Sequence, residues 1–308
     1  MEEKKYAHKS VMLEECIEAL NIRPDGLYAD GTVGLGGHSE QIAKRLTTGT
    51  LLCFDKDTEA LEYSRERLAP FGERVRFFHR DFRSIADALH QEGIPGVDGV
   101  LLDLGVSSLQ LDKPERGFSY RFDAPLDMRM NTQGGLSAYQ LCNEAEESEL
   151  KRILYQYGEE RFAPRIAAAI VQNRPVETTL QLVEIISNAM PAKARREQHP
   201  AKRSFQALRI AVNDELGALR ECLESLTGLL NPGGRAAILT FHSLEDRMVK
   251  AVFNAGATGC TCPPSFPACV CGKLPSLSRQ TRQSPSKDEQ EANSRSACAK
   301  LRWTERLR

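Results

Sequence analysis

The sequence has few aromatic residues and no long hydrophobic run. Aromatic side chains make up 6% of its 308 residues, with a single tryptophan. No stretch of about 18 apolar residues occurs, which argues against a membrane-spanning helix. The first ten residues, MEEKKYAHKS, are charged and contain no apolar segment of signal-peptide length. These absences predict a cytoplasmic chain without a membrane partner.

The composition lacks the marks of disorder or of a fibrous repeat. Apolar residues account for 41% and charged residues for 27%, close to the average of globular chains. At roughly 150 residues per domain, the length predicts about two domains. The nine cysteines, with no export signal beside them, indicate a reducing compartment, where thiols stay free or bind metal.

The net charge of the chain is close to zero, but positive charge is concentrated in two tracts. Residues 193–209 hold six basic side chains against one acidic, and residues 273–308 hold nine against four. Each tract carries +5, so the remaining residues carry −11. A polyanionic partner is one interpretation; charge alone favours a solvated helix face and a loose tail.

Short apolar runs alternate with helix-like stretches in the first hundred residues. The runs lie at 27–30, 51–55, 75–79 and 97–104, and another follows at 235–241. Runs that are apolar throughout are typical of strands buried on both faces, so the order predicts βαβ units and a parallel sheet. Thr58 is a plausible N-cap of the helix after the second run. Near the C-terminus Ala299, Leu301 and Trp303 alternate with polar residues, which predicts an antiparallel edge strand.

Helix signals replace strand signals after Leu104. Ser137 and Gln140 form a capping-box pattern, and Thr178 begins a second helical stretch. We therefore expect a helical domain at 106–204, inserted between the two parts of a sheet domain at 1–105 and 205–308. One long amphipathic helix is predicted over 208–230, ended by the turn at 231–234.

A glycine-rich segment, Asp30-Gly31-Thr32-Val33-Gly34-Leu35-Gly36-Gly37-His38, joins the first strand to the first helix of the sheet. Glycines there let the backbone approach a ligand. The dinucleotide fingerprint would have a further glycine where Ser39 stands, which weakens a nicotinamide interpretation. An acidic residue followed by Gly-x-Gly-Gly better suits a cationic adenosine ligand without a phosphate. A purely structural turn remains an alternative.

Two further acidic residues end predicted strands. Asp55 ends the second strand, where a carboxylate can accept hydrogen bonds from both ribose hydroxyls. The rival role, capping the next helix, fits Asp57 better than Asp55. Asp103 ends the fourth strand beside Gly105 and two serines, at the sheet edge where ligands bind, and this context favours a site residue over a helix cap.

A histidine, His242, stands at the carboxyl end of the fifth predicted strand. A lone histidine in such a position is more often structural than functional. Ser243 and Asp246, which follow it, have the spacing of a helix cap, so a helix is expected to begin there.

Four clustered cysteines leave their role open. Cys260, Cys262, Cys269 and Cys271 could offer four thiolates to one zinc, but C-x-C is tighter than the usual spacing. Reduced loop thiols are the alternative. The surrounding residues, 259–294, are predicted to be mobile.

Many spaced motifs together carry a resemblance to one family. They include His8-Lys9-Ser10-Val11-Met12-Leu13, the glycine segment, Leu101 to Ser108, Glu115 to Ser119, Pro125 to Met130, Tyr157 to Ala163, Phe241 to Arg247 and Ala299 to Arg302. The chain resembles the MraW/RsmH family, the bacterial 16S ribosomal RNA cytosine-N4 methyltransferases. Two departures are Ser10, where the family usually has Pro, and residues 293–298, a degraded Asn-Pro-Arg-Ala-Arg-Ser tract.

The resemblance implies an α/β protein with a Class I (Rossmann-like) methyltransferase sheet, an inserted all-helical domain and S-adenosylmethionine as the cofactor. We assign no metal ligand. The cofactor positions that it carries over are Gly36, Gly37, His38, Asp55, Phe82, Asp103 and Gln110.

The implied substrate is a cytidine in 16S ribosomal RNA within the small ribosomal subunit. Asp103, or the backbone carbonyls beside it, is the expected acceptor for the N–H of the cytosine amino group. The residues expected to contact RNA are Lys193, Arg195, Arg196, Lys202, Arg203 and His242. A homodimer is left open. Rival functions are a C5-cytosine methyltransferase, which would need a nucleophile such as Cys262, and an RNA-binding assembly factor without turnover.

Overall fold

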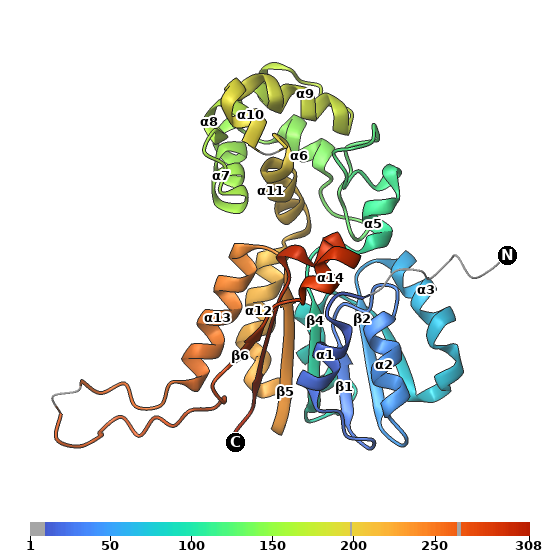
Figure 1. Cartoon of the computed structure of the whole chain (residues 1–308), viewed down its shortest axis with the longest axis vertical. Coiled ribbons are helices and arrows are strands. Elements are labelled where there is room, and N and C mark those ends of the chain that lie inside the picture. Colours follow the sequence, from blue (N-terminus) through green and yellow to red (C-terminus); the bar gives the residue numbers. More distant parts are fainter. Residues whose placement is uncertain (1–9, 198, 264–265) are drawn as a thin grey trace. The chain divides into compact units, whose positions relative to one another are not determined.

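The computed structural model describes residues 10–197, 199–263 and 266–308. The chain divides into two compact units (Figure 1), Met1–Gly105 with Leu216–Arg308, here the sheet unit, and Val106–Glu215, here the helical unit. The second boundary follows Glu215 and not residue 204 as predicted. The reason is that Phe205 and Leu208 are buried in the core of the helical unit.

The described part of the sheet unit contains one seven-stranded sheet with the order β3-β2-β1-β4-β5-β7-β6. The strands are β1 (Leu27–Asp30), β2 (Thr50–Asp55), β3 (Val75–His79), β4 (Val97–Asp103), β5 (Leu230–Thr240), β6 (Thr281–Gln283) and β7 (Lys300–Glu305). Strands β1 to β5 pair in parallel, and β7 pairs antiparallel with both β5 and β6. This topology confirms the predicted Rossmann-like sheet.

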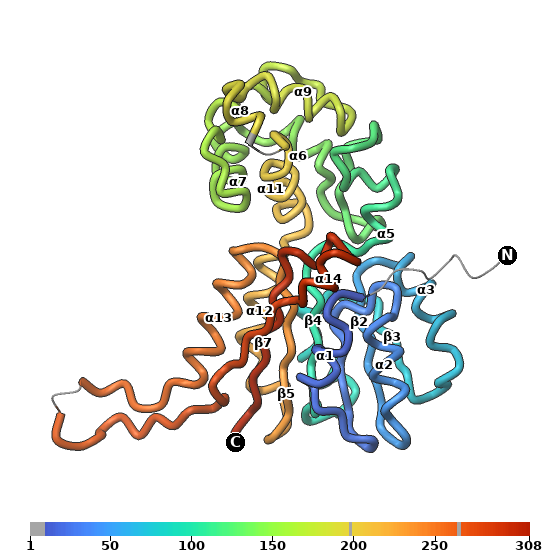
Figure 2. The backbone as a smooth tube through the Cα atoms, viewed as in Figure 1, coloured from blue at the N-terminus to red at the C-terminus, as the bar shows by residue number. Residues whose placement is uncertain are grey.

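The C-terminal strand lies inside the sheet and not at its edge. Figure 2 shows β7 beside β5, and the short strand β6 pairs with the other side of β7. The prediction of an antiparallel strand is therefore confirmed, whereas its edge position is wrong. The sequence did not predict β6, because its three residues are all exposed and show no alternation of apolar and polar side chains.

Helices cover both faces of the sheet. Their bounds are α1 (Leu13–Leu20), α2 (Gly37–Arg45) and α3 (Thr58–Leu68) on one face, and α4 (Ile85–Gln91), α12 (Glu215–Leu229) and α13 (Ser243–Ala257) on the other. Leu101 belongs to the first apolar layer and its neighbour Leu102 to the second. Successive strand residues point to opposite faces, so continuous apolar runs are what this double cover requires.

The remaining elements of the sheet unit are short. They are the 3₁₀ turns η1 (Ala69–Arg74), η2 (Phe82–Ser84) and η4 (Ser294–Cys298), and the helix α14 (Lys287–Ala292). Thus the tract at 259–294, predicted as mobile, contains β6 and α14. Among the described residues, no helix is both long and apolar enough to cross a membrane.

At α3 the structure decides between the two caps considered, Asp57 and Thr58, and at α13 it replaces the predicted cap. Asp57, not Thr58, is the N-cap of α3, and its side chain accepts a hydrogen bond from the backbone N–H of Glu59. His242, not Ser243, is the N-cap of α13 and forms a capping box with Glu245. In both cases the cap is the residue before the threonine or serine, because the residue with extended backbone supplies the acceptor.

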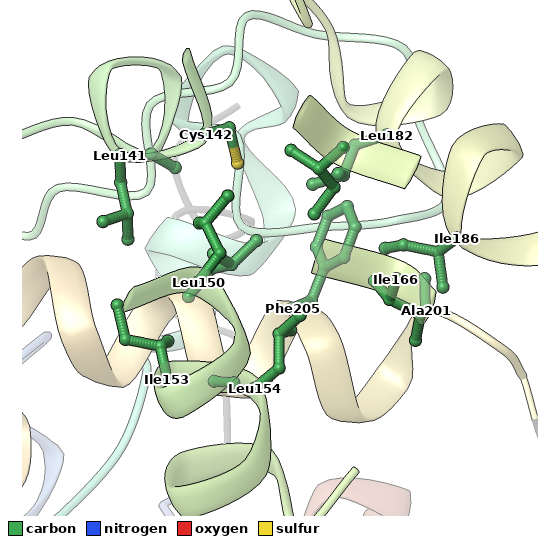
Figure 3. Close-up of a cluster of buried hydrophobic side chains, with 14 of the residues drawn as sticks. Leu141, Cys142, Leu150, Ile153, Leu154, Ile166, Leu182, Ile186, Ala201 and Phe205 are labelled. Carbon is green, nitrogen blue, oxygen red and sulfur yellow. The ribbon is translucent and has the colours of Figure 1, made fainter. Parts of the chain in front are cut away.

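The helical unit holds α5 (Ser108–Asp112), η3 (Pro114–Arg116), α6 (Ala138–Glu144), α7 (Glu147–Gly158), α8 (Ala163–Gln172), α9 (Thr179–Ala189), α10 (Ala192–Glu197) and α11 (Lys202–Asn213). The predicted caps are confirmed: Ser137 and Gln140 form a capping box, and Thr178 caps α9. Figure 3 shows side chains from several of these helices, among them Leu150, Leu182 and Phe205, meeting in one apolar cluster.

The predicted long helix over 208–230 is two helices. Asp214 adopts the left-handed conformation, with a φ of 47°, between α11 and α12. The two parts bury different residues: Leu208 lies in the core of the helical unit, whereas Leu223 lies in the core of the sheet unit. The turn at 231–234 lies within β5, between Leu230, which pairs with Val97, and Arg235, which pairs with Gly99.

Candidate functional site

The site is built at the point where the strand order of the sheet reverses. Strands β1 and β4 are neighbours, and each ends in an aspartate, Asp30 and Asp103. From β1 the chain passes through α2 to the neighbouring strand β2, whereas β4 pairs on its other side with β5. Open α/β sheets bind their ligands at the carboxyl ends of the strands where the order reverses in this way.

The glycine-rich loop has the tight geometry that its sequence predicts. Gly34 and Gly36 have φ values of 51° and 77°, and Gly36 is the N-cap residue of α2. A Cβ on Gly37 would lie 2.0 Å from the Oγ of Ser10, the residue that departs from the family pattern. His8 and Lys9 of the same motif lie outside the described residues. A side chain at position 37 would therefore require the Ser10 hydroxyl to move.

Arg67 holds this loop in place, a role that the sequence analysis missed. Its Nη1 donates to the carbonyl of Leu35 at 3.2 Å, and its Nε donates to Oε2 of Glu40 at 2.7 Å. Arg67 lies on α3, far along the chain and outside any motif. Only the packing of α3 against α2 reveals it.

Asp55 binds the glycine loop from the next strand. Its Oδ2 accepts from the backbone N–H of Gly34 at 2.9 Å, and its Oδ1 accepts from that of Asp57 at 2.9 Å. Burial raises the pKa of Asp55 to about 6, against these two hydrogen bonds, which lower it. Each carboxylate oxygen can accept a further bond, so the predicted role on ribose hydroxyls is compatible with this geometry.

Asp103 is the most perturbed carboxyl group at the site. Burial first, and then the charges of Asp30 and Glu245, raise its pKa to about 8. The side chain as a whole is 27% exposed. Its Oδ1 is buried and has no hydrogen-bond partner among the described residues. A buried oxygen without a donor is unfavourable in the folded chain, and a ligand N–H placed there would satisfy it.

His38 lies beside Asp103. Its Nε2 is 3.1 Å from the backbone carbonyl of Val11, and its Nδ1 is 3.6 Å from Oδ2 of Asp103. A carbonyl can only accept, so Nε2 carries the proton in that bond, and Nδ1 is the ring nitrogen that faces Asp103. The structure thus brings together two of the predicted cofactor residues.

Asp30 is a buried carboxylate that the predicted set did not include. It is 1% exposed, and its Oδ2 accepts from the hydroxyl of Ser39 at 2.6 Å. Its Oδ1 accepts from the backbone N–H of Thr32 at 3.1 Å, and burial raises its pKa to about 6. Ser39 occupies the position where a dinucleotide fingerprint has glycine. Its hydroxyl has a structural task there that a glycine would leave undone.

Phe82 and Gln110 complete the predicted cofactor set. Phe82 begins η2 and is partly buried, and its Cβ would lie 2.9 Å from a Cβ on Gly31, so the phenylalanine stands at the carboxyl end of β1. Gln110 is 4% exposed and belongs to the helical unit, where its Oε1 accepts from the N–H of Ser107 in a capping box. Its role toward a cofactor stays a prediction.

Most of the predicted RNA-binding residues lie in the helical unit. Lys193, Arg195 and Arg196 are carried by α10, whereas Lys202 and Arg203 begin α11. An open pocket of ≈ 430 Å³ is lined by residues that include three cations, Arg161, Lys193 and Arg203. The sequence analysis missed Arg161, which precedes α8 and lies outside the basic tract.

Other basic residues of the two tracts are already neutralised. Arg209 forms a double hydrogen bond with Glu215, with both N–O distances at 2.8 Å. Lys300 and Arg302 of β7 bind Asp246 of α13 at 3.1 and 2.8 Å. Asp246, expected to cap α13, instead binds this strand to the helix.

His242 lies in the sheet unit and its ring is largely used by the capping box. Its side chain is 8% exposed, and its Nε2 lies 3.1 Å from Oε1 of Glu245. Oε2 of Glu245 accepts from the N–H of Phe241 at 2.8 Å. Contact of His242 with RNA stays a prediction.

Comparison with known protein families identifies the family of this chain. The model of the MraW methylase family matches residues 5–307. The chain belongs to the MraW methylase family. Membership makes the chain a methylase and sets aside the nicotinamide alternative, in agreement with the hydroxyl of Ser39 at the last position of the glycine fingerprint.

Relatives in this family match the chain from end to end. A protein of Brevibacillus brevis named Ribosomal RNA small subunit methyltransferase H is 52% identical over 98% of both chains. Proteins of the same name from Clostridium botulinum and Heliobacterium modesticaldum are 53% and 52% identical, over 96% and 98% of this chain and 98% and 99% of their own. A solved rRNA methylase from Streptococcus thermophilus overlaps 97% of this chain and 98% of its own with a TM-score of 0.45 and 11% identity.

Proposed function

We propose that this chain transfers a methyl group from S-adenosylmethionine to the N4 amino group of a cytidine in 16S ribosomal RNA. The observation that carries the proposal is the buried Oδ1 of Asp103, which has no hydrogen-bond donor among the described residues. An exocyclic amino group is such a donor, and the carboxyl end of β4 is where a ligand would bring it. Family relatives named as small-subunit rRNA methyltransferases support the RNA substrate.

The glycine loop suits the cofactor. Gly36 lets the loop turn with a positive φ where α2 begins, and Asp55 can accept from ribose hydroxyls while it holds Gly34. The ring of Phe82 offers an apolar surface for adenine at the end of β1. When bound, S-adenosylmethionine supplies the methyl group and a sulfonium leaving group.

Asp103 would orient the attacking nitrogen. The lone pair of a cytosine amino group is delocalised into the ring, and an N–H bond to a carboxylate favours a pyramidal, more reactive nitrogen. As N4 forms its bond to the methyl carbon, the bond from that carbon to sulfur breaks and its electron pair stays on sulfur. The N–H proton then passes to the carboxylate of Asp103, whose raised pKa suits it to hold a proton briefly.

His38 would position this carboxyl group. Its Nδ1 faces Oδ2 of Asp103 while Nε2 is held by the carbonyl of Val11. The other carboxylate oxygen, Oδ1, is then the one directed to the substrate. Positioning of this kind contributes much of the acceleration when the leaving group is already strong.

The helical unit would hold the RNA backbone. One pocket is lined by three cations, Arg161, Lys193 and Arg203. Lys193 lies on α10 and Arg203 on α11, and these helices also carry Arg195, Arg196 and Lys202. A base must leave its stack to reach the methyl group, which demands backbone contacts on the flanking nucleotides. We propose that the RNA is presented within the small ribosomal subunit, in the cytoplasm, where the nine free cysteines would stay reduced.

The test is transfer of labelled methyl groups to small ribosomal subunits that lack the modification, followed by nucleoside digestion and mass spectrometry. We expect the label in N4-methylcytidine. Label at C5 or on a ribose would overturn the acceptor chemistry. If a C5 product appears, Cys262→Ala decides whether a cysteine nucleophile is used. Tight cofactor binding without transfer to any subunit preparation would instead favour the assembly factor.

A further inference from the structure

Four cysteines of the loop between α13 and β6 converge on one point. The Sγ atoms of Cys260, Cys262, Cys269 and Cys271 all lie within 4.8 Å of one another. The Sγ of Cys271 is 3.6 Å from that of Cys269 and 3.7 Å from that of Cys260. Thiolates bound to one tetrahedral zinc at about 2.3 Å are separated from one another by about 3.8 Å. The sulfur atoms therefore already have the spacing of the four corners of such a site.

We propose that Cys260, Cys262, Cys269 and Cys271 bind one zinc ion as a structural site of the sheet unit. The two C-x-C pairs each supply two neighbouring ligands. Four protein ligands leave no open position for water or substrate, as in structural zinc sites. The site is thus separate from methyl transfer, and its test does not depend on the proposed function.

Backbone groups around the cluster favour the thiolate form. The N–H of Val270 donates to Sγ of Cys262, and the N–H of Cys262 donates to Sγ of Cys260, both at 3.4 Å. Thiolates bind zinc, and hydrogen bonds to the sulfur are the usual outer support of such sites.

The loop has no apolar core among its described residues that could order it otherwise. Phe266, Val270 and Leu274 are 50%, 75% and 60% exposed. The two ends of the loop are joined at its base, where the N–H groups of Ser276 and Leu277 both donate to the carbonyl of Gly256, at 2.9 and 3.1 Å. A metal ion bound by the cysteines would order the part of the loop beyond this base. Small segments without an apolar core need such a metal for stability.

The geometry favours one bound metal ion over an iron–sulfur cluster or disulfide bonds between the four cysteines. A four-iron cluster would hold its thiolates farther apart, because the cluster itself lies between them. A disulfide needs sulfurs about 2.05 Å apart, and the two shortest separations are 3.6 and 3.7 Å. These two alternatives become outcomes of the experiment.

The experiment measures metal in the full-length chain, purified under reducing conditions and without an affinity tag. We expect about one zinc per chain by elemental mass spectrometry, the stoichiometry of a single four-thiolate site. After removal of zinc with a chelator, Co²⁺ should give the intense visible bands of tetrahedral thiolate coordination. Cys271→Ser should lose stoichiometric zinc. Cys298→Ser, which removes an exposed cysteine outside the cluster, should keep it.

A second readout needs no variant. In the zinc-loaded chain, the four cluster thiols should resist alkylation while Cys298 reacts, and chelation should expose all four. The proposal is overturned if the reduced chain takes up no zinc, if Cys271→Ser retains it in full, or if the purified chain contains iron and sulfide or two disulfides instead.

Discussion

The Nδ1 of His38 lies 3.6 Å from Oδ2 of Asp103, which joins the helix after the glycine loop to the end of β4. The backbone N–H of Asp103 also donates to the hydroxyl of Thr32 at 2.6 Å, so the glycine loop contacts this aspartate twice. Two segments that are separated along the chain thus form one small site. The pKa of Asp103, raised to about 8 by burial and by its acidic neighbours, makes that site testable through pH.

Methyl transfer should increase with pH through the pKa of Asp103. If the ionised carboxylate accepts the amino N–H, kcat/KM rises up to about pH 8 and is level above it. Asp103→Asn should lower kcat by roughly 10²-fold and remove this limb of the profile. The profile is measured with limiting RNA; a level profile from about pH 6 upward in the wild type would contradict the assignment. Saturating cofactor should move the midpoint to lower pH, because a sulfonium charge favours the carboxylate.

The Asp103 carboxyl group should also make the free energy of unfolding depend on pH, in the direction opposite to that of methyl transfer. Its folded pKa of about 8 lies above the ordinary value of 3.8, so the folded chain binds more protons between these values. The free energy of unfolding should therefore fall as pH rises toward 8. Asp103→Asn should be more stable than the wild type near pH 8 and should lose this advantage as the pH falls toward about 4.

Thermal unfolding without ligands measures this difference. Each kcal/mol should appear as a Tm shift of about 2–4 °C in a unit of this size. Both proteins should still lose stability as pH rises from about 4 to 6, because Asp30 and Asp55 keep pKa values raised to about 6. A variant that is less stable than the wild type at every pH would show that Asp103 stabilises the fold as a carboxylate.

Gly36→Ala should weaken cofactor binding, whereas Gly72→Ala should not. Gly36 has left-handed helical φ and ψ, 77° and 16°, so alanine there costs about 1–2 kcal/mol of folding free energy. Gly72 lies in η1 with a φ of 57°, so alanine there is strained as well, and its Cβ meets nothing within 4 Å. Only the strain at position 36 acts on the start of α2, in the glycine loop. Cofactor titration calorimetry compares the two; equal affinities would remove the loop from the site.

Charge reversal in the helical unit should weaken RNA binding without a change in cofactor affinity. Lys193→Glu with Lys202→Glu removes two cations from α10 and α11. We expect the slope of log K against log salt to fall by about 0.7 for each lost phosphate contact to single-stranded RNA. Lys151→Glu, an exposed position on α7, is the matched control for each of the two reversals made singly. An equal effect of the control would indicate only net charge.

Local sequence was enough to predict the strands and several caps. The runs that end in Asp30, Asp55 and Asp103 are mainly apolar without alternation, and burial between two helix layers accounts for that pattern. Ser137 and Thr178 cap helices because a side-chain oxygen satisfies an N–H a few residues further along the chain. Such interactions need no distant partner.

Two errors came from distant packing. The apolar period through residues 208–230 is helical throughout, but Asp214 interrupts it so that α11 and α12 can bury their faces in separate cores. Likewise, β7 has the pattern of an edge strand, and only its pairing with β6 places it inside the sheet. Neither outcome is encoded in spacing alone.

The sequence by itself determined which residues end the strands, where the glycine loop bends and which tract is basic, because these depend on neighbours along the chain. The tertiary structure decided the chemistry. It placed His38 against Asp103, left Oδ1 of Asp103 buried without a donor from the described residues, and gathered four sulfurs around one point. Desolvation and Coulomb interactions depend on distances in space, and these exist only once the chain has folded.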